Sequence, residues 1–213
     1  MLDLLLPRRC VVCAAPRTLL CDACRAALPP LQPPLCAHCG APTVWPVERC
    51  RECSGRRLAF VRARAAVEYD GTVRALCRSW KERGVRSLAD AAARVVAERL
   101  PRPDAEVLTF VPDGGRRRTR GYHPAEQLAR ALAAAWTLPC EPLLDRRGGA
   151  RQRGLSRDER RRNVAHAFVA RSGGARSVVL VDDVYTTGAT AHAAAAALGG
   201  RVEVVTFART VRS

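Results

Sequence analysis

Apolar and polar residues follow a strand-and-helix pattern over the larger, carboxyl-terminal part of the chain. Residues 178–181 are an unbroken apolar run, and residues 107–112 are interrupted by a single threonine. Such runs are typical of strands that are covered on both faces, as in a parallel sheet. Residues 59–69 alternate weakly and predict a further strand at the start of this part.

Between and after these strands, the spacing of apolar residues favours helices over residues 73–83, 87–100, 125–136 and 189–198. In the second of them the apolar side chains form one stripe, made of Leu88, Ala91, Ala92, Val95, Val96 and Leu100. Asp70 and Gly71 predict a turn. Residues 58–213 are therefore expected to form an α/β domain, a parallel sheet flanked by helices.

Residues 1–57 show another pattern, with few large apolar residues and four C-x-x-C pairs: Cys10/Cys13, Cys21/Cys24, Cys36/Cys39 and Cys50/Cys53. Four thiolates satisfy tetrahedral Zn²⁺ completely, so sites of this kind are structural. We expect a small double zinc-ribbon module with two Zn²⁺ sites. Tandem pairing is the simplest arrangement, with Pro-rich residues 28–35 as the spacer, and an interleaved pairing stays open.

Disulfides or redox thiols are the alternative for these cysteines. Residues 1–6 are apolar but short and run into Pro7-Arg8-Arg9, unlike a signal peptide. No run approaches the ~20 apolar residues of a membrane span. We expect a cytoplasmic protein, in which regular pairs favour metal. Cys77 and Cys140 lie outside the pairs and are expected to be buried. His38, between Cys36 and Cys39, is expected to be a solvated knuckle residue, with a metal ligand as the alternative.

Charge adds a preference for phosphate-bearing partners. The formal net charge is +16, and Lys81 is the one lysine among 36 basic residues. A strongly basic chain attracts nucleotides and nucleic acid. Because Lys carries a compact point charge where Arg carries a planar one, Lys81 is a candidate site residue. An ordinary exposed lysine is the alternative.

Candidate chemistry follows the run at residues 178–181. Asp182 and Asp183 come next, and open α/β sheets bind ligands at the carboxyl ends of their strands. The loop Thr186-Thr187-Gly188-Ala189-Thr190 then leads into the helix at 189–198. Free N–H groups and the helix dipole favour an anion there, most often phosphate. A turn with two solvated acids before a Thr-capped helix is the alternative.

This motif resembles the phosphoribosyl pyrophosphate motif of type I phosphoribosyltransferases. The resemblance implies that Asp182 and Asp183 face the ribose hydroxyls and a Mg²⁺ ion, and that residues 186–190 hold the 5-phosphate. The basic, Gly-containing loop at residues 113–122 follows the strand at 107–112 and corresponds to the pyrophosphate loop, which assigns Arg116 and Arg120 to the pyrophosphate. Lys81 is assigned to the same substrate.

Residues 146–162 are the most basic stretch of the chain and also contain three glycines. This mixture predicts a flap that closes over an anion and excludes water from a reactive ribosyl group. It would equally suit the backbone of single-stranded DNA. The stretch lacks aromatic residues for base stacking, which disfavours sequence-tolerant single-strand binding by stacking.

The order of the motifs along nearly the whole chain resembles the ComF family of competence proteins, specifically the ComFC type. The motifs are Pro7-Arg8-Arg9-Cys10 with the paired ribbons, Tyr69-Asp70-Gly71, Trp80-Lys81, Val111-Pro112, Arg116, Arg120-Gly121-Tyr122, Gln152, Leu155-Ser156, Arg162-Asn163-Val164, Ala167-Phe168 and the stretch 182–190. The resemblance implies natural transformation, in which imported single-stranded DNA is handled at the inner face of the membrane. Two departures are Tyr122-His123-Pro124, where the family commonly has Phe-Asn-Gln, and Thr186, where purine-salvage transferases place a catalytic acid.

Together these features favour a phosphoribosyltransferase-like protein that binds phosphoribosyl pyrophosphate or a related nucleotide with Mg²⁺. If it is an enzyme, it transfers a pentosyl group, with Asp182 and Asp183 as the catalytic acids. A non-enzymatic DNA-binding accessory that works with a competence helicase or a membrane channel is the alternative. A sensor of phosphoribosyl pyrophosphate is a third.

Overall fold

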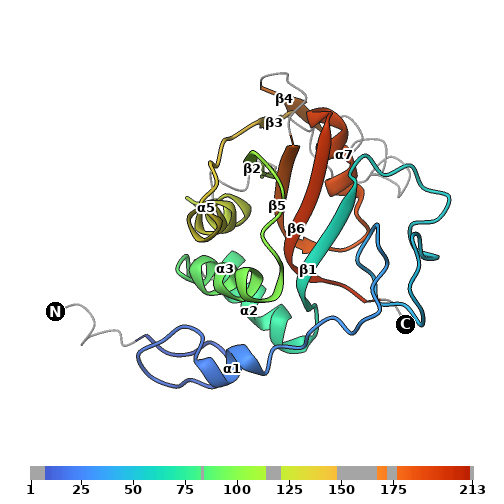
Figure 1. Ribbon diagram of the computed structural model, residues 1–213. Helices are drawn as coiled ribbons and strands as arrows, with labels where there is room; N and C mark the ends of the chain where they lie inside the picture. The colour runs from blue at the N-terminus through green and yellow to red at the C-terminus, as the bar shows by residue number, and fades with distance from the viewer. Residues whose placement is uncertain (1–7, 83, 114–120, 148–166, 172–176, 212–213) are drawn as a thin grey trace, which may run out of the picture.

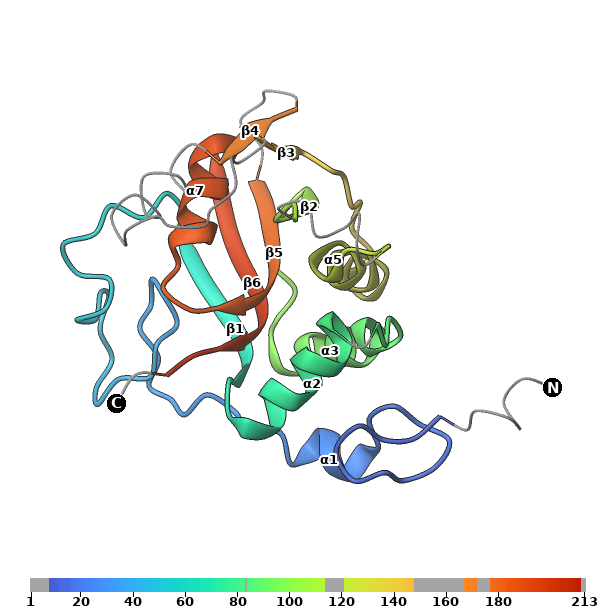
Figure 2. The same ribbon diagram turned by 180° about the vertical axis from the view of Figure 1, so that it is seen from behind.

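A four-stranded parallel sheet forms the centre of the molecule in the computed structural model, which describes residues 8–82, 84–113, 121–147, 167–171 and 177–211. The strand order is β1 (Arg62–Glu68), β6 (Arg201–Arg209), β5 (Ser177–Tyr185) and β2 (Val107–Phe110). Helices α2, α3 and α5 lie on one side of this sheet and α7 on the other (Figures 1 and 2). The predicted fold class, a parallel α/β sheet flanked by helices, is confirmed.

Burial on both faces explains the unbroken apolar run in β5. Val179 and Val181 pack in the cluster that contains α2, α3 and α5, whereas Leu180 packs in the cluster that contains α7. Side chains of a strand alternate between faces, so a strand covered twice needs apolar residues at successive positions.

Two strands differ from the prediction. Strand β5 does not end with the apolar run but continues to Tyr185, so both acids lie within the strand. Strand β6, which was not predicted, pairs with β1 on one side and β5 on the other and is buried at every position after Arg201. Its Glu203 and Arg209 are both buried, and these charged residues hide its strand character in the sequence.

The helices lie close to their predicted ranges: α2 (Gly71–Lys81), α3 (Leu88–Arg99), α5 (Pro124–Trp136) and α7 (Ala189–Leu198). The turn predicted at Asp70 and Gly71 is instead the start of α2. Asp70 is its N-cap, and the carboxylate accepts a hydrogen bond from the Val73 N–H at 2.7 Å. An N-cap Asp stabilises a helix by about 1 kcal/mol.

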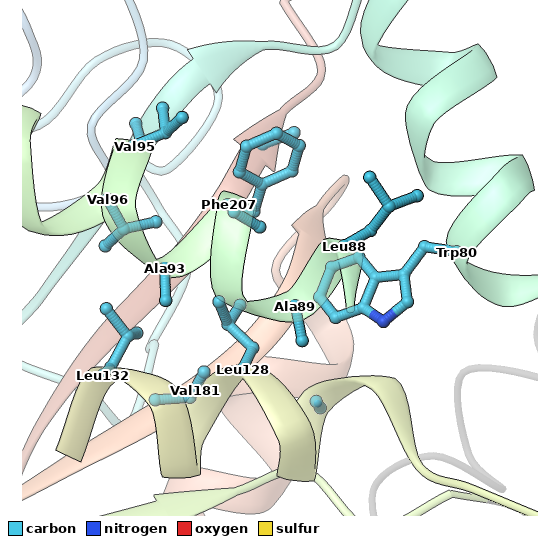
Figure 3. Packing of buried hydrophobic residues seen from close by; sticks show 14 of the residues in the cluster. Trp80, Leu88, Ala89, Ala93, Val95, Val96, Leu128, Leu132, Val181 and Phe207 are labelled. Atoms are coloured by element: carbon cyan, nitrogen blue, oxygen red, sulfur yellow. The ribbon is translucent and has the colours of Figure 1, made fainter. Parts of the chain in front are cut away.

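The larger core cluster fixes the end of α2 beside the sheet. Figure 3 shows Trp80 of α2 next to Leu88 of α3, with α5 contributing Leu128 and the sheet Phe207. Trp80 is 1% exposed, and its carbonyl accepts a hydrogen bond from the Tyr122 hydroxyl. Burying such a side chain contributes about 1.5–3 kcal/mol. Lys81, the next residue, is thereby held at the edge of the core.

The two cysteine ribbons contact different parts of this domain. The first, with α1 (Asp22–Ala26), lies against α3, where Arg25 forms an ion pair with Glu98. The second lies against the edge strand β1, whose Ala63 N–H donates to the His38 carbonyl at 2.8 Å. The domain boundary at residue 57 stays a prediction.

A small antiparallel pair, β3 (Leu144–Arg146) with β4 (Phe168–Ala170), lies beside α7. Among the helices that the structure describes, none combines the length and apolar character needed to span a membrane.

Candidate functional site

The eight paired cysteines form two groups of four: Cys10, Cys13, Cys21 and Cys24 in the first ribbon, and Cys36, Cys39, Cys50 and Cys53 in the second. Within each group all sulfur atoms lie within 4.8 Å of one another. The pairing is therefore tandem, and the interleaved alternative is excluded by this grouping.

The sulfur positions fit Zn²⁺ and not disulfides. Tetrahedral ligands at a Zn–S distance of about 2.3 Å place two sulfurs about 3.8 Å apart. Cys36 and Cys53 are 3.7 Å apart, and Cys13 and Cys21 are 3.6 Å apart. A disulfide requires about 2.05 Å, and all ten cysteines are free. Each cluster thus presents a closed Cys₄ site suited to structural zinc.

Backbone N–H groups favour the thiolate form of one cysteine in each cluster. Burial raises the pKa of Cys36, but N–H groups of Cys39, Cys50 and His38 outweigh it and lower the pKa to about 7. Burial opposes backbone N–H groups in the same way at Cys10, where the pKa falls to about 6. Because zinc binds the thiolate, these N–H groups favour the metal-binding form.

The expectation for His38 was wrong. The side chain is 9% exposed, its Nδ1 lies 3.1 Å from the Val61 carbonyl oxygen, and its ring stacks on Phe60. Burial lowers the pKa of His38, so the imidazole stays neutral. His38 therefore fixes the knuckle to the strand that follows. Of the two cysteines outside the pairs, Cys77 is buried as expected and Cys140 is half-buried.

The second group of predicted residues meets at the end of β5. Asp182 and Asp183 follow each other in the strand, so their side chains point to opposite faces of the sheet. Asp182 borders a small, open pocket that is also lined by Thr186, Gly188 and Thr190. The structure therefore brings one predicted acid together with the predicted phosphate loop.

Asp183 is paired with the lone lysine. Lys81 Nζ lies 2.6 Å from Asp183 Oδ2, with the two side chains 30% and 15% exposed. Burial alone would lower the pKa of Lys81, but the Asp183 carboxylate outweighs burial and raises it. The compact cation therefore stays charged. The alternative of an ordinary exposed lysine is contradicted by this pair.

Burial and the adjacent Asp183 carboxylate raise the pKa of Asp182 to about 7. An acid with such a pKa changes its charge near neutral pH, which is typical of functional sites and uncommon for solvated turns. Asp182 Oδ1 also accepts a hydrogen bond from the Asp183 N–H at 2.9 Å.

The loop at residues 186–190 contains backbone N–H groups that donate no hydrogen bond within the described residues. The N–H groups of Thr187 and Gly188 are of this kind. Helix α7 begins at Ala189 without a side-chain cap on Gly188, and the Thr187 hydroxyl reaches the Ala189 N–H only at 3.4 Å. An uncapped helix start beside a pocket is able to bind an anion.

Gly188 is required at this turn for two reasons. Its φ is +73°, in the left-handed region that favours glycine, and a Cβ there would lie 2.2 Å from the Tyr185 hydroxyl oxygen. The ring of Tyr185 therefore lies directly beneath the loop.

Several predicted residues cannot be placed. Arg116, Arg120 and residues 148–162 of the basic stretch lie outside the described residues, as do Gln152, Leu155, Ser156 and Arg162 to Val164.

Tyr122 and His123, which depart from the family's usual residues, have structural roles. Tyr122 donates to the Trp80 carbonyl, and the His123 imidazole accepts from the Glu126 N–H at 3.1 Å as the N-cap of α5.

Two residues at the loop were not predicted. The Arg56 guanidinium donates to the Thr187 carbonyl at 2.8 Å, and Arg209 stacks over the Tyr185 ring at 4.6 Å. In a chain with 36 basic residues, no sequence signal separates these two arginines from the others.

Comparisons with known proteins agree with the ribbon assignment. A family model described as a double zinc ribbon domain matches residues 1–54, where both cysteine clusters lie. The amino-terminal part is therefore a double zinc ribbon. No curated protein matches the sequence.

Two solved structures are similar to part of the chain. One is glutamine phosphoribosylpyrophosphate amidotransferase from B. subtilis complexed with ADP and GMP, 23% identical, with a TM-score of 0.41. The other is described as the allosteric regulatory enzyme of purine biosynthesis, 22% identical, with a TM-score of 0.40. Each match covers 57% of this chain and 26% of the other chain, so the shared region is a minor part of those proteins.

Proposed function

We propose that the carboxyl-terminal domain binds phosphoribosyl pyrophosphate or a related nucleotide in the pocket beside residues 186–190. The observation that carries the proposal is the grouping of Asp182, Thr186, Gly188 and Thr190 around one pocket at an uncapped helix start. N–H groups and hydroxyls suit the 5-phosphate, and the carboxylate suits ribose hydroxyls.

Mg²⁺ fits this site in part. Mg²⁺ is usually held by one or two carboxylates together with substrate phosphates. Asp182 borders the pocket and is available for this role, whereas Asp183 Oδ2 is engaged by Lys81. We infer that Asp182 is the first ligand of a Mg²⁺ ion carried in with the diphosphate. Mg²⁺ would neutralise phosphate charge and help the pyrophosphate to depart.

If the protein is a transferase, its own residues act mainly by electrostatic stabilisation. The bond from ribose to pyrophosphate breaks with positive charge on the sugar and negative charge on the leaving group. Asp182 would face the sugar, and Asp183 would act beside it through its pair with Lys81, while Arg116 and Arg120 would face the phosphates. Thr186 stands where an acid would deprotonate a purine, so the acceptor is expected to need no such base.

The binding test is calorimetry with phosphoribosyl pyrophosphate and Mg²⁺. The variant Asp182→Asn, alone and with Asp183→Asn, removes the carboxylates at constant shape and is expected to abolish Mg²⁺-dependent binding. Unchanged affinity in the double variant would remove the assignment. The matched control is Asp145→Asn, an exposed acid of β3 whose ion pair with Arg171 lies outside the pocket. Release of pyrophosphate with a panel of bases then tests for transfer.

We further propose a role in DNA uptake, in the manner that the ComF-like order of motifs implies. The net charge of +16 supports contact with a phosphate backbone. The test is the salt dependence of single-stranded oligonucleotide binding, where affinity is expected to fall steeply between low and physiological salt. A flat response would exclude tracking of the backbone.

A further inference from the structure

The second ribbon and the phosphate loop share one buried side chain. Arg209, at the end of β6, is 1% exposed. One of its nitrogens donates to the Cys39 carbonyl at 2.7 Å and another to Glu52 Oε2 at 2.8 Å. Cys39 is in the second cluster, and Glu52 lies between the two cysteines of its last pair. The Arg209 guanidinium therefore contacts the second ribbon at two places, Cys39 and Glu52.

The other face of the same guanidinium lies 4.6 Å from the centre of the Tyr185 ring. That ring lies beneath Gly188, because a Cβ on Gly188 would be 2.2 Å from its hydroxyl oxygen. A movement of Arg209 would therefore move the residue on which the loop rests. Because these groups are in direct contact, a displacement of one of them displaces the next.

The chain that follows the last cysteine contacts the loop directly. Arg56 donates to the Thr187 carbonyl at 2.8 Å and to the Glu52 carbonyl at 3.4 Å. The Ala59 N–H donates to His192 Nδ1 at 3.0 Å, in the first turns of α7. The second ribbon and the residues that follow it therefore reach the loop by two routes. One passes through Arg209 and Tyr185, and the other is the direct contact of Arg56.

The first ribbon has a different attachment. Arg99 of α3 donates to the carbonyls of Arg25 and Leu28 at 3.3 and 3.0 Å. The first ribbon also forms an ion pair with α3, between Arg25 and Glu98. Among the described residues, no hydrogen bond or ion pair joins the first ribbon to residues 186–190. The first ribbon therefore serves as an internal control for the second.

We propose that Arg209 and Arg56 are positioning residues through which zinc in the second ribbon shapes the phosphate loop, so that zinc retention there and sugar-phosphate binding favour each other. The inference rests on the proposed function, because it requires a sugar phosphate in the pocket. Zinc supplies the folding energy of a ribbon and so holds Cys39 and Glu52 in place. Coupling between two sites is reciprocal, so the sugar phosphate must stabilise zinc in the second ribbon by the same factor.

The experiment follows zinc release from the holoprotein into a coloured chelator, with and without saturating ribose 5-phosphate or phosphoribosyl pyrophosphate. Release is expected in two phases, and Cys13→Ser, at an exposed ligand of the first ribbon, identifies the phase of that ribbon. In an equilibrium titration with the chelator, the sugar phosphate is expected to raise the chelator concentration that removes half of the second-ribbon zinc by about fivefold or more, and to leave the first-ribbon zinc unchanged. An unchanged titration, or an equal change for both ribbons, would overturn the coupling.

Variants separate positioning from folding. Arg56→Gln removes a partly exposed hydrogen bond and is expected to weaken ribose 5-phosphate binding several-fold and to reduce the zinc protection, with zinc stoichiometry unchanged. Arg209→Met is expected to weaken binding by about tenfold or more, with partial rescue by Arg209→Lys. Arg99→Met removes comparable bonds at the first ribbon and is expected to leave affinity unchanged.

The two proposals fail differently. If the wild-type protein binds neither sugar phosphate, both fall. If it binds them but Arg56→Gln and Arg209→Met bind equally well and zinc release is indifferent to the ligand, the coupling alone is wrong.

Discussion

Lys81 Nζ lies 2.6 Å from Asp183 Oδ2, so the chain's one lysine neutralises one of the two neighbouring acids of β5. The pair joins the end of α2 to the central sheet and leaves Asp182 to face the pocket. Lys81 also supplies a positive charge that the phosphates of a diphosphate ligand are able to contact. The Lys81–Asp183 pair is therefore neutral before any ligand arrives, and Asp182 is the acid that is left to meet the ligand.

Lys81→Met is expected to destabilise the protein, because it leaves the carboxylate of Asp183 buried without its partner. In a double-mutant cycle with Asp183→Asn, measured by denaturant unfolding, we expect a coupling free energy of about 1–3 kcal/mol. The matched control is the pair Arg78–Glu82, 3.5 Å apart with side chains 63% and 62% exposed. Exposed pairs of this kind couple by about 0.3–0.5 kcal/mol. Additive effects at both pairs would contradict the structural role of Lys81.

Asp182 is expected to make stability depend on pH. Its pKa, raised by burial and by Asp183 to about 7, exceeds the unfolded value near 3.8. The folded state thus binds the proton more tightly, and the ionised acid costs stability progressively as pH rises from about 4 to 7. Asp182→Asn is expected to melt higher than wild type by a margin that widens over this range and then levels off.

Thermal melts at half-unit steps of pH measure this margin, with Asp145→Asn as the exposed control. A constant margin would show that Asp182 ionises normally. The gain in stability is expected to accompany the loss of Mg²⁺-dependent binding, since strained functional groups commonly cost stability.

Gly188→Ala is expected to damage the loop in two ways, because the residue has a positive φ and closely approaches Tyr185. We expect a loss of at least about 2 kcal/mol in the free energy of unfolding and loss of phosphate binding. The control is Gly84→Ala, at φ +72° with nothing within 4 Å of the added Cβ, where only the backbone cost of a positive φ acts.

Removing the Tyr185 hydroxyl tests how much of the cost of Gly188→Ala comes from contact with that hydroxyl. In a Tyr185→Phe background, the cost of Gly188→Ala is expected to fall, because the hydroxyl oxygen is the nearest atom to the added Cβ. Equal costs in both backgrounds would show that the hydroxyl adds nothing to the cost, since the ring carbon Cζ, 2.6 Å from the added Cβ, remains in both. Denaturant unfolding measures each variant.

Zinc stoichiometry is expected to be two ions per chain by elemental analysis, one in each cysteine cluster. Cys13→Ser or Cys50→Ser is expected to reduce it to about one, because the three remaining thiolates no longer close the site. Cys77→Ser, at a buried cysteine outside both clusters, serves as the control and should retain both ions. A single ion per wild-type chain would contradict two complete Cys₄ sites, because one Zn²⁺ ion takes four thiolates.

Local patterns were sufficient for much of this protein. Helix α7 begins and ends where its apolar run predicts, at Ala189 and Leu198, because a glycine at each end marks the boundary. The four cysteine pairs similarly predicted two zinc ribbons, since two residues between thiolates is a short-range geometric requirement. Asp182 and the loop at 186–190 were predicted to lie together because they are neighbours in sequence.

The tertiary structure decided what depends on distant residues. The charge pair of Lys81 and Asp183 exists because Trp80 is packed under α3 and holds the end of α2 at the sheet. Strand β6 is central because β1 and β5 flank it, although Glu203 and Arg209 obscure its pattern. Arg209 became the link between the second ribbon and Tyr185 only once these strands paired. Sequence carries the preferences of single segments, whereas contacts between segments are set by how the whole core packs.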